Sequence, residues 1–259
     1  MKTLLGGLVL MLIMTTAAQA ALKTELIDYR QGDTALEGYL AYDDSLTGKR
    51  PGVLVVHEWW GLNDYAKRRT EQLARLGFVA FALDMYGKGK TTLSAQEASM
   101  LAGPFRNDRA FGRARAAAGL DVLRKRPEVD PERLAAIGYC FGGTVALELA
   151  RSGADLKGVA SFHGGLSTPH PEDARNIKGK VLVLHGADDT FESPAEIAAF
   201  QDEMRRAGVD WQMNIYGGAV HSFTNPDAGK AKIKGVAYDE KADRRSWQAM
   251  RAFFEEIFK

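Results

Sequence analysis

The amino-acid sequence predicts an α/β fold: a mostly parallel, doubly wound β-sheet with helices on both faces and an N-terminal antiparallel hairpin at its edge. The first observation behind this prediction is that short, continuous apolar runs alternate with longer segments of helical periodicity. The second is that most of these runs lack polar alternation, as expected of parallel strands covered by helices on both sides. A chain of 259 residues, 46% of them hydrophobic, can also bury the large core of a single domain.

Residues 1–20 have the pattern of a secretory signal peptide. Lys2 precedes an apolar run over 4–14, and Ala18 and Ala20 flank Gln19 in a small-x-small cleavage site. The apolar run is too short to span a membrane comfortably. We therefore expect cleavage after Ala20, a secreted or periplasmic location, a single domain over residues 21–259, and no stable membrane association of the mature chain.

Composition narrows the function classes. The formal net charge is +1 and no basic stripe stands out, so a nucleic-acid partner is not expected. Cys140 is the one cysteine, which excludes an internal disulfide. Neither a metal-ligand spacing nor a glycine-rich phosphate loop is present, so no metal and no other cofactor is predicted. We expect a monomer that acts on a small molecule.

The strands are predicted in chain order from the apolar runs. Runs over 23–29 and 36–42 surround a Gln-Gly-Asp turn and predict the hairpin. Buried strands of the parallel sheet are predicted at 53–56, 78–83, 134–137, 159–162 and 181–184. Apolar and polar residues alternate over 211–215, which predicts a half-buried strand near an edge.

The helices fall between these strands. Helical segments are predicted at 64–76, 108–125, 141–151, 194–207 and about 239–258. In the last of them, large apolar side chains recur on one stripe, which is typical of core packing rather than of a binding surface.

The centre of the chain is a Gly-x-Cys-x-Gly pattern around Cys140. The run over 134–137 reads as a strand and 141–151 as a helix, so Cys140 is predicted to lie on a sharp strand-to-helix turn. Small residues two positions to either side, Gly138 and Gly142, allow such a crowded turn to form. A helix N-terminus favours a thiolate, so the pattern indicates a nucleophile. The alternative is a buried structural cysteine.

Other polar residues follow the predicted strands directly. Because the carboxyl ends of parallel strands meet at one edge of the sheet, these residues are expected to surround Cys140. Glu58 follows the 53–56 strand, Asp188 and Asp189 follow the 181–184 strand, and His221 follows the 211–215 strand. The order of nucleophile, acid and histidine predicts that His221 keeps Cys140 as thiolate while an aspartate orients the imidazole. The remaining strand-end histidines, His57, His163 and His185, do not fit the position of the base.

Five stretches together resemble the dienelactone hydrolase family. They are His57-Glu58-Trp59-Trp60-Gly61-Leu62-Asn63, Leu83-Asp84-Met85-Tyr86-Gly87, Gly138-Tyr139-Cys140-Phe141-Gly142-Gly143, Gly186-Ala187-Asp188-Asp189 and Gly218-Ala219-Val220-His221-Ser222-Phe223. The resemblance implies an α/β-hydrolase fold, a Cys–His–Asp triad, no metal, and hydrolysis of an ester or lactone through an acyl-enzyme.

The resemblance also implies roles for single residues. Its Gly-x-x-Asp spacing, counted from Gly186, selects Asp189 as the triad acid and leaves Asp188 as a turn residue. It implies that Glu58 pairs with the thiol in the resting site and helps to take its proton. The backbone N–H groups of Trp59 and Phe141 are expected to form the oxyanion hole.

The sequence departs from the family at the residues that bind the substrate carboxylate. Dienelactone hydrolases proper bind the substrate carboxylate with two arginines, and the matching neighbourhoods here contain none. Lys88 offers a charge without the planar fork of arginine, while Trp60 and Phe223 are expected to line the pocket. We therefore expect neutral aryl esters to react at least as well as carboxylated lactones. A thioesterase or peptidase on the same site, and a redox or binding protein that uses Cys140, stay open as alternatives.

Overall fold

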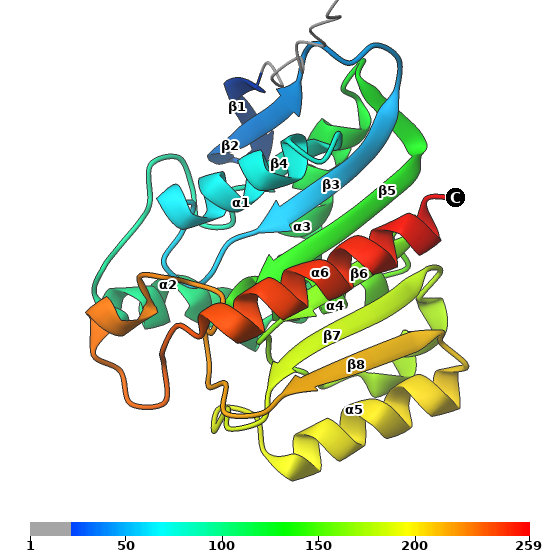
Figure 1. The fold of residues 1–259 in the computed structure, drawn as a ribbon. Helices are drawn as coiled ribbons and strands as arrows, with labels where there is room; N and C mark the ends of the chain where they lie inside the picture. Colours follow the sequence, from blue (N-terminus) through cyan, green and yellow to red (C-terminus); the bar gives the residue numbers. More distant parts are fainter. Residues whose placement is uncertain (1–21) are drawn as a thin grey trace, which may run out of the picture.

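The computed structural model describes residues 22–259, whose main feature is a sheet of eight strands with helices on both sides (Figure 1). The strands are β1 (Leu22–Gln31), β2 (Thr34–Asp43), β3 (Arg50–Val56), β4 (Val79–Leu83), β5 (Val129–Tyr139), β6 (Gly158–Phe162), β7 (Lys180–Gly186) and β8 (Trp211–Tyr216). The α-helices are α1 (Asp64–Ala74), α2 (Ala95–Asn107), α3 (Arg109–Arg124), α4 (Phe141–Arg151), α5 (Pro194–Ala207) and α6 (Glu240–Ile257). Two short 3₁₀ helices, η1 (Pro171–Asn176) and η2 (Ala228–Ala231), lie in loops.

The order of strands across the sheet is β1-β2-β4-β3-β5-β6-β7-β8. The strands from β4 to β8 pair in parallel, whereas β1 and β2 form an antiparallel hairpin and β2 runs antiparallel to β4. The predicted fold class is therefore confirmed. Because β3 and β5 are neighbours at the centre, the loops that follow them open side by side at one edge of the sheet.

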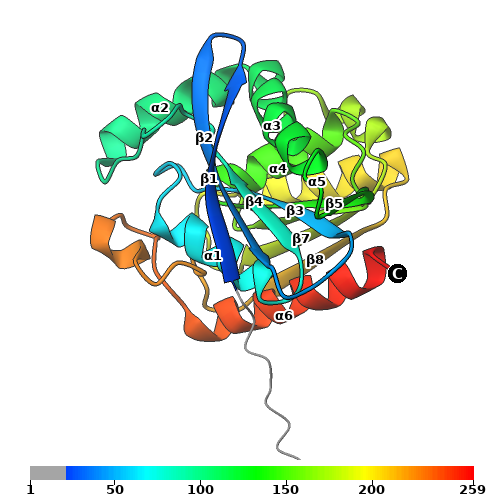
Figure 2. The ribbon, with the colours of Figure 1, turned by 90° about the horizontal axis from the view of Figure 1, so that it is seen from above.

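Two helical layers cover the sheet (Figure 2). Helices α1 and α6 pack on one face, where Leu73, Met250 and Phe254 meet the inward side chains of the strands. Helices α2, α3, α4 and α5 pack on the other face and form the larger core. Both faces of the central strands are thus buried, which explains their continuous apolar runs.

Most elements lie where the sequence places them. Helices α4 and α5 have the predicted bounds, and α5 begins at a capping box between Ser193 and Glu196. Helix α2 was not predicted, because Gly103 and Pro104 in its last turns are residues that usually end a helix. The predicted signal peptide lies outside the described residues. Within 22–259, no helix is long and apolar enough to cross a membrane.

Candidate active site

Cys140 lies on a strained turn between β5 and α4. Its backbone has φ 54° and ψ −120°, a conformation that L-residues other than glycine rarely adopt. The Cys140 N–H donates to the Phe162 carbonyl at 3.0 Å and to Nδ1 of His163 at 3.1 Å. The turn holds the thiol at the N-terminus of α4, part-exposed to solvent.

The two glycines beside this turn are required by close backbone contacts. A Cβ atom on Gly138 would lie 1.9 Å from the carbonyl oxygen of Gly142. On Gly142, a Cβ would lie 2.3 Å from the carbonyl oxygen of Val56 at the end of β3. Neither contact can be relieved by moving a side chain, so the pattern seen in the sequence reflects packing of the turn against the sheet.

His221 and Asp189 form a part-buried hydrogen-bonded pair next to Cys140. Nδ1 of His221 lies 2.8 Å from Oδ2 of Asp189, and Oδ1 of Asp189 accepts the backbone N–H of Phe191 at 2.9 Å. Burial opposes a charge on the imidazole, but the Cys140 sulfur and the Asp189 carboxylate raise the pKa of His221 well above its usual value. Asp188, in contrast, is exposed. The structure thus brings Asp189, not Asp188, to the histidine.

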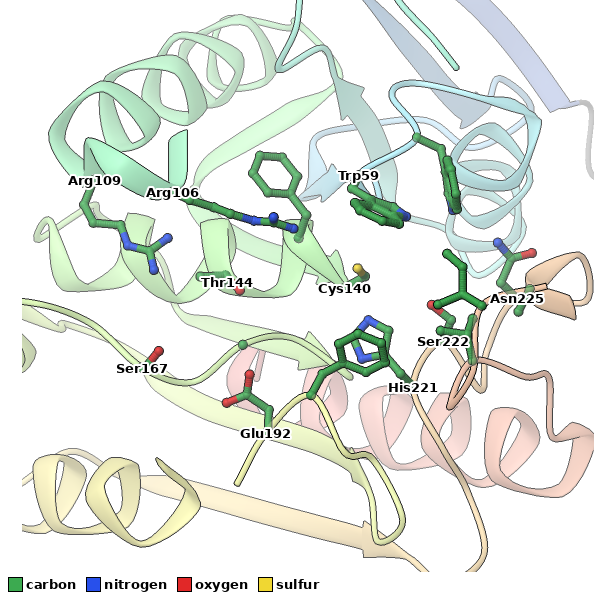
Figure 3. Close-up of a pocket in the computed structure, with 17 residues that line it drawn as sticks. Trp59, Arg106, Arg109, Cys140, Thr144, Ser167, Glu192, His221, Ser222 and Asn225 are labelled. Atoms are coloured by element: carbon green, nitrogen blue, oxygen red, sulfur yellow. The ribbon is translucent and has the colours of Figure 1, made fainter. Parts of the chain in front are cut away.

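These groups open into a cavity of about 410 Å³ (Figure 3). Trp59, Trp60, Phe191, Ile233 and Val236 supply its apolar lining. Its polar lining includes Thr144, Ser167, Glu192 and Asn225. Burial and the carboxylates of Glu196 and Asp189 raise the pKa of Glu192 to about 7, against a hydrogen bond from the Leu166 N–H that lowers it. The predicted position of Trp60 at the pocket agrees with this lining.

The two N–H groups expected to form the oxyanion hole have no acceptor within residues 22–259. Phe141 is the first residue of α4, where a backbone N–H has no partner in the helix. Trp59 lies in a turn that the Gly61 N–H closes onto the Glu58 carbonyl at 3.3 Å. The Tyr86 hydroxyl donates to the Trp59 carbonyl at 3.0 Å and fixes this turn. Both N–H groups are therefore available to an anion at the site.

Glu58 is buried beneath the cavity, and its contacts differ from those expected. The Ser222 hydroxyl donates to Oε1 at 3.0 Å and the Asn225 side-chain amide donates to Oε2 at 2.6 Å. Burial raises the pKa of this carboxyl, although both hydrogen bonds act in the opposite direction. The expected pairing of Glu58 with the thiol is not what the structure shows, because both carboxylate oxygens are engaged by the loop that follows His221.

A second histidine, His163, accepts a hydrogen bond from the backbone of the predicted nucleophile. Since Nδ1 of His163 accepts the Cys140 N–H, Nε2 carries the proton and donates to the Thr224 hydroxyl at 2.7 Å. Burial, together with the nearby charges of His221 and Arg69, lowers the pKa of His163 well below its usual value. The ring is therefore neutral. Sequence reasoning placed His163 near the site but gave it no role, because its backbone contact is invisible in the sequence.

Two predicted substrate-binding residues lie outside the cavity. The Lys88 ammonium binds Asp28 at 2.6 Å and Glu37 at 2.9 Å, both on the N-terminal hairpin. Phe223 is fully buried and packs edge-on against the His163 ring behind the site. Both placements correct the prediction. Lys88 is drawn away by two carboxylates, and Phe223 fills the core beneath the loop.

Two arginines that sequence reasoning missed do line the cavity. Arg106 belongs to the last turn of α2 and Arg109 is the first residue of α3. The two neighbourhoods that match the family's arginines contain none, so these two arginines reach the cavity from other segments of the chain. Arg106 was missed because no helix was predicted over 95–107. Arg109 lies in the predicted 108–125 helix, but no local pattern indicates that it faces the cavity. Among the described residues, no group of three or more His, Cys, Asp or Glu side chains is arranged to hold a metal ion.

Comparisons with known proteins relate the chain to one family. Residues 36–258 match the model of the dienelactone hydrolase family. A solved structure of a dienelactone hydrolase-like promiscuous phosphotriesterase from metagenomic libraries is 46% identical, with TM-score 0.88, and covers 92% of this chain and 99% of its own. A putative carboxymethylenebutenolidase of Aquifex aeolicus is 26% identical over 91% of this chain and 99% of its own. A probable 2-oxo-3-(5-oxofuran-2-ylidene)propanoate lactonase of Bradyrhizobium is 29% identical over 78% and 86%, respectively.

Proposed function

Because the chain belongs to the dienelactone hydrolase family and is a carboxylic ester hydrolase of that family, we propose that Cys140, His221 and Asp189 form its catalytic triad. The substrates proposed are small carboxylic esters or lactones, cleaved through an acyl-enzyme on Cys140. The observation that carries this proposal is the strained turn that presents the thiol to the cavity beside the His221–Asp189 pair.

In the first half of the reaction, the Cys140 thiolate attacks the carbonyl carbon of the substrate. The carbonyl oxygen gains the negative charge and is received by the N–H groups of Phe141 and Trp59. The raised pKa of His221 keeps the imidazole protonated beside the thiolate. When the tetrahedral intermediate collapses, the C–O bond to the alcohol breaks, and His221 transfers its proton to the departing oxygen.

In the second half, water hydrolyses the thioester. The neutral His221 takes a proton from water, and the resulting hydroxide attacks the acyl carbon; collapse expels the Cys140 thiolate and leaves the acid. Asp189 accepts a hydrogen bond from Nδ1–H of His221 throughout, so Nε2 faces the reacting atoms.

Glu58 acts on this chemistry as a positioning residue. By holding Ser222 and Asn225, it fixes the two sides of the loop that begins at His221. Ser222 has a positive φ of 57°, so the backbone there needs such support. The proton-accepting role that the family resemblance implies for Glu58 stays a prediction.

The test is intact mass spectrometry after rapid mixing with a neutral aryl ester. A transient mass increase equal to one acyl group, absent from Cys140→Ala, is the expected result. Hydrolysis without any adduct in a quenched-flow series, or equal turnover by Cys140→Ala, would contradict the acyl-enzyme. A parallel panel of oxygen esters, thioesters and peptides of the same acyl group separates an esterase from the thioesterase or peptidase alternative.

Hydrolysis of neutral phosphotriesters is a second candidate activity. It is supported by the 46% identity over almost the full length of the promiscuous phosphotriesterase described above. The same thiolate and the same pair of N–H groups suit a phosphoryl oxygen. Release of nitrophenol from a diethyl aryl phosphate, lost together with esterase activity in Cys140→Ala, is the expected result. Absence of release removes this candidate and leaves the ester hydrolase unaffected.

The proposed location is secreted or periplasmic, on the strength of the signal pattern in residues 1–20. Expression of the full chain in a bacterium tests it. A mature mass that begins at Ala21, recovered from the periplasm, is expected.

A further inference from the structure

Helix α1 carries a charged side chain into the core. Arg69 has an exposed fraction of only 6%. Its guanidinium lies over the rings of Tyr65, Tyr139 and Trp247, with its central carbon 5.3, 5.6 and 5.4 Å from the ring centres. Taking a charge out of water costs free energy, and apolar residues often replace a buried ion pair without loss of stability. The burial of Arg69 is therefore better explained by what it holds in place.

The guanidinium of Arg69 binds groups from three parts of the fold. Nη2 donates to the Thr224 carbonyl at 2.6 Å and also to the carboxylate of Asp243 on α6. Nε donates to the Tyr65 hydroxyl at 3.3 Å, and Nη1 donates to Oε1 of Gln72 at 3.0 Å, both on α1. Helices α1 and α6 lie on the same face of the sheet (Figure 1). Arg69 therefore fastens the segment of Thr224 to two packed helices.

Thr224 lies three residues after His221, and its side chain is held as firmly as its backbone. Its hydroxyl forms a hydrogen bond with the Tyr65 hydroxyl at 2.6 Å and accepts the Nε2–H of His163 at 2.7 Å. The residue is fully buried, so no water competes for these contacts. The loop that carries His221 is thus fixed at Thr224 through both the carbonyl and the hydroxyl.

The same group of residues also holds the turn of the nucleophile. Nδ1 of His163 accepts the Cys140 N–H at 3.1 Å, so the hydrogen bonds continue from Thr224 to the strained turn. Tyr139, the residue before Cys140, has its ring against the Arg69 guanidinium. Arg69 is therefore linked to Cys140 by two routes, one of hydrogen bonds and one of packing.

The relative position of these two segments matters for the proposed chemistry. Cys140 and His221 lie on different segments, and proton transfer requires their side chains to lie within hydrogen-bond distance. A displacement of about 1 Å caused by a change outside the reacting groups can cost about a hundredfold in rate. Both segments contain strained backbone, since φ is 54° at Cys140 and 57° at Ser222. Contacts that oppose relaxation of this strain are needed on both sides.

Resting on the hydrolase function proposed above, we propose that Arg69 is a positioning residue that holds the loop of His221 beside the turn of Cys140. Thr224 is the link, because its carbonyl receives Arg69 and its hydroxyl receives His163. None of these three residues is part of the cavity lining. Loss of the network should therefore lower kcat and leave KM almost unchanged.

The first experiment compares the same substitution at two neighbouring arginines of α1. We expect Arg69→Lys to lower kcat for a neutral aryl ester about tenfold to a hundredfold, with KM within about threefold of wild type. Lysine keeps the charge but lacks the planar fork that binds several partners at once. Arg68→Lys is the matched control, because Arg68 is exposed and contacts only Asp227, at 3.6 Å; both constants should stay unchanged.

A second pair of variants tests the hydroxyl of Thr224 and decides the matter if Arg69→Lys does not fold. Thr224→Val keeps the side-chain shape and the carbonyl but leaves the Nε2–H of His163 without an acceptor, so kcat should fall about tenfold. Thr224→Ser keeps the hydroxyl and should restore kcat to within about threefold of wild type. All rates are measured well below the Tm of each variant, where a purely structural role would leave kcat intact. An unchanged kcat in folded Arg69→Lys or Thr224→Val would overturn the proposal.

Alkylation of Cys140 by iodoacetamide separates this proposal from the hydrolase function itself, because it requires no hydrolysis. At neutral pH the rate constant should fall about tenfold in Arg69→Lys, since a displaced His221 no longer stabilises the thiolate, and should not change in Arg68→Lys. If no ester is hydrolysed but alkylation shows this dependence, the function fails and the positioning role stands. If esters are hydrolysed through Cys140 while Arg69→Lys changes neither kcat nor alkylation, the function stands and the positioning role is refuted.

Discussion

Replacing Asp189 with asparagine should reduce kcat/KM by about three to four orders of magnitude, equivalent to about 4–5 kcal/mol of transition-state stabilisation. The reason lies in the second contact of Asp189. Its Oδ1 accepts the Phe191 N–H at 2.9 Å, so the one oxygen of an asparagine would be held there. The amide NH₂ would then face Nδ1 of His221, which must become an acceptor. The imidazole proton would move to Nε2, where it blocks transfer of a proton from the thiol.

The assay is hydrolysis of a neutral aryl ester, with the pH dependence of Cys140 alkylation by iodoacetamide as a second readout. Because Asp189 contributes to the raised pKa of His221, Asp189→Asn should lower that pKa. Imidazolium would then no longer stabilise the thiolate at neutral pH, and alkylation should require a higher pH. Asp188→Asn is the matched control, and its activity should stay within about twofold of wild type because its side chain is exposed.

The reasoning fails if Asp189→Asn retains more than a tenth of the wild-type rate in a folded protein. It fails equally if Asp188→Asn causes the larger loss, since the acid of the triad would then be the neighbouring residue. An unchanged alkylation profile would show that Asp189 orients the imidazole without influencing its charge.

Three further outcomes are expected. Cys140→Ala should abolish ester hydrolysis while its thermal unfolding stays within a few degrees of wild type; residual turnover above a few per cent would count against a thiol nucleophile. Gly138→Ala should destabilise the protein by about 3 kcal/mol, seen as a Tm lower by roughly 6–12 °C, because its Cβ would meet the Gly142 backbone; an unchanged Tm would disprove the close contact. Since burial raises the pKa of Glu192 to about 7, folding is favoured while this carboxyl is protonated and loses stability as pH rises through 7. The free energy of unfolding of Glu192→Gln, relative to that of wild type, should therefore rise by about 1–2 kcal/mol between pH 5 and pH 8, after allowance for solvent screening. A difference that stays constant over this pH range would refute the raised pKa.

The parts of the fold and site that the sequence predicts are those encoded by local patterns. The turn at Cys140 is predictable because only glycine fits at 138 and 142, where a Cβ would clash with the backbone. The strand ends bring Asp189 and His221 together because a parallel sheet aligns its carboxyl ends at one edge. Each of these inferences needs only neighbours in the chain and the geometry of the sheet.

The parts that the sequence does not predict depend on pairings between distant residues. Lys88 has two carboxylate partners on the hairpin, and no local pattern indicates that they draw it from the cavity. Glu58 is held by side chains more than 160 residues later in the chain. Arg106 was missed because its helix contains residues that usually end helices, and its orientation depends on packing against α3. Which of many possible partners a charged side chain binds depends on the folded structure, because the partners are distant in the sequence.

The segment that carries α2 and α3 has a consequence for how such proteins diverge. It joins β4 to β5, a single residue, Asp108, separates its two helices, and it supplies both Arg106 and Arg109. None of Cys140, Asp189 and His221 belongs to it. Inherited changes in this segment can therefore alter the lining of the cavity while Cys140, Asp189 and His221 stay intact. Gene duplication followed by drift in this one segment is a short evolutionary route to a cavity of different shape and charge.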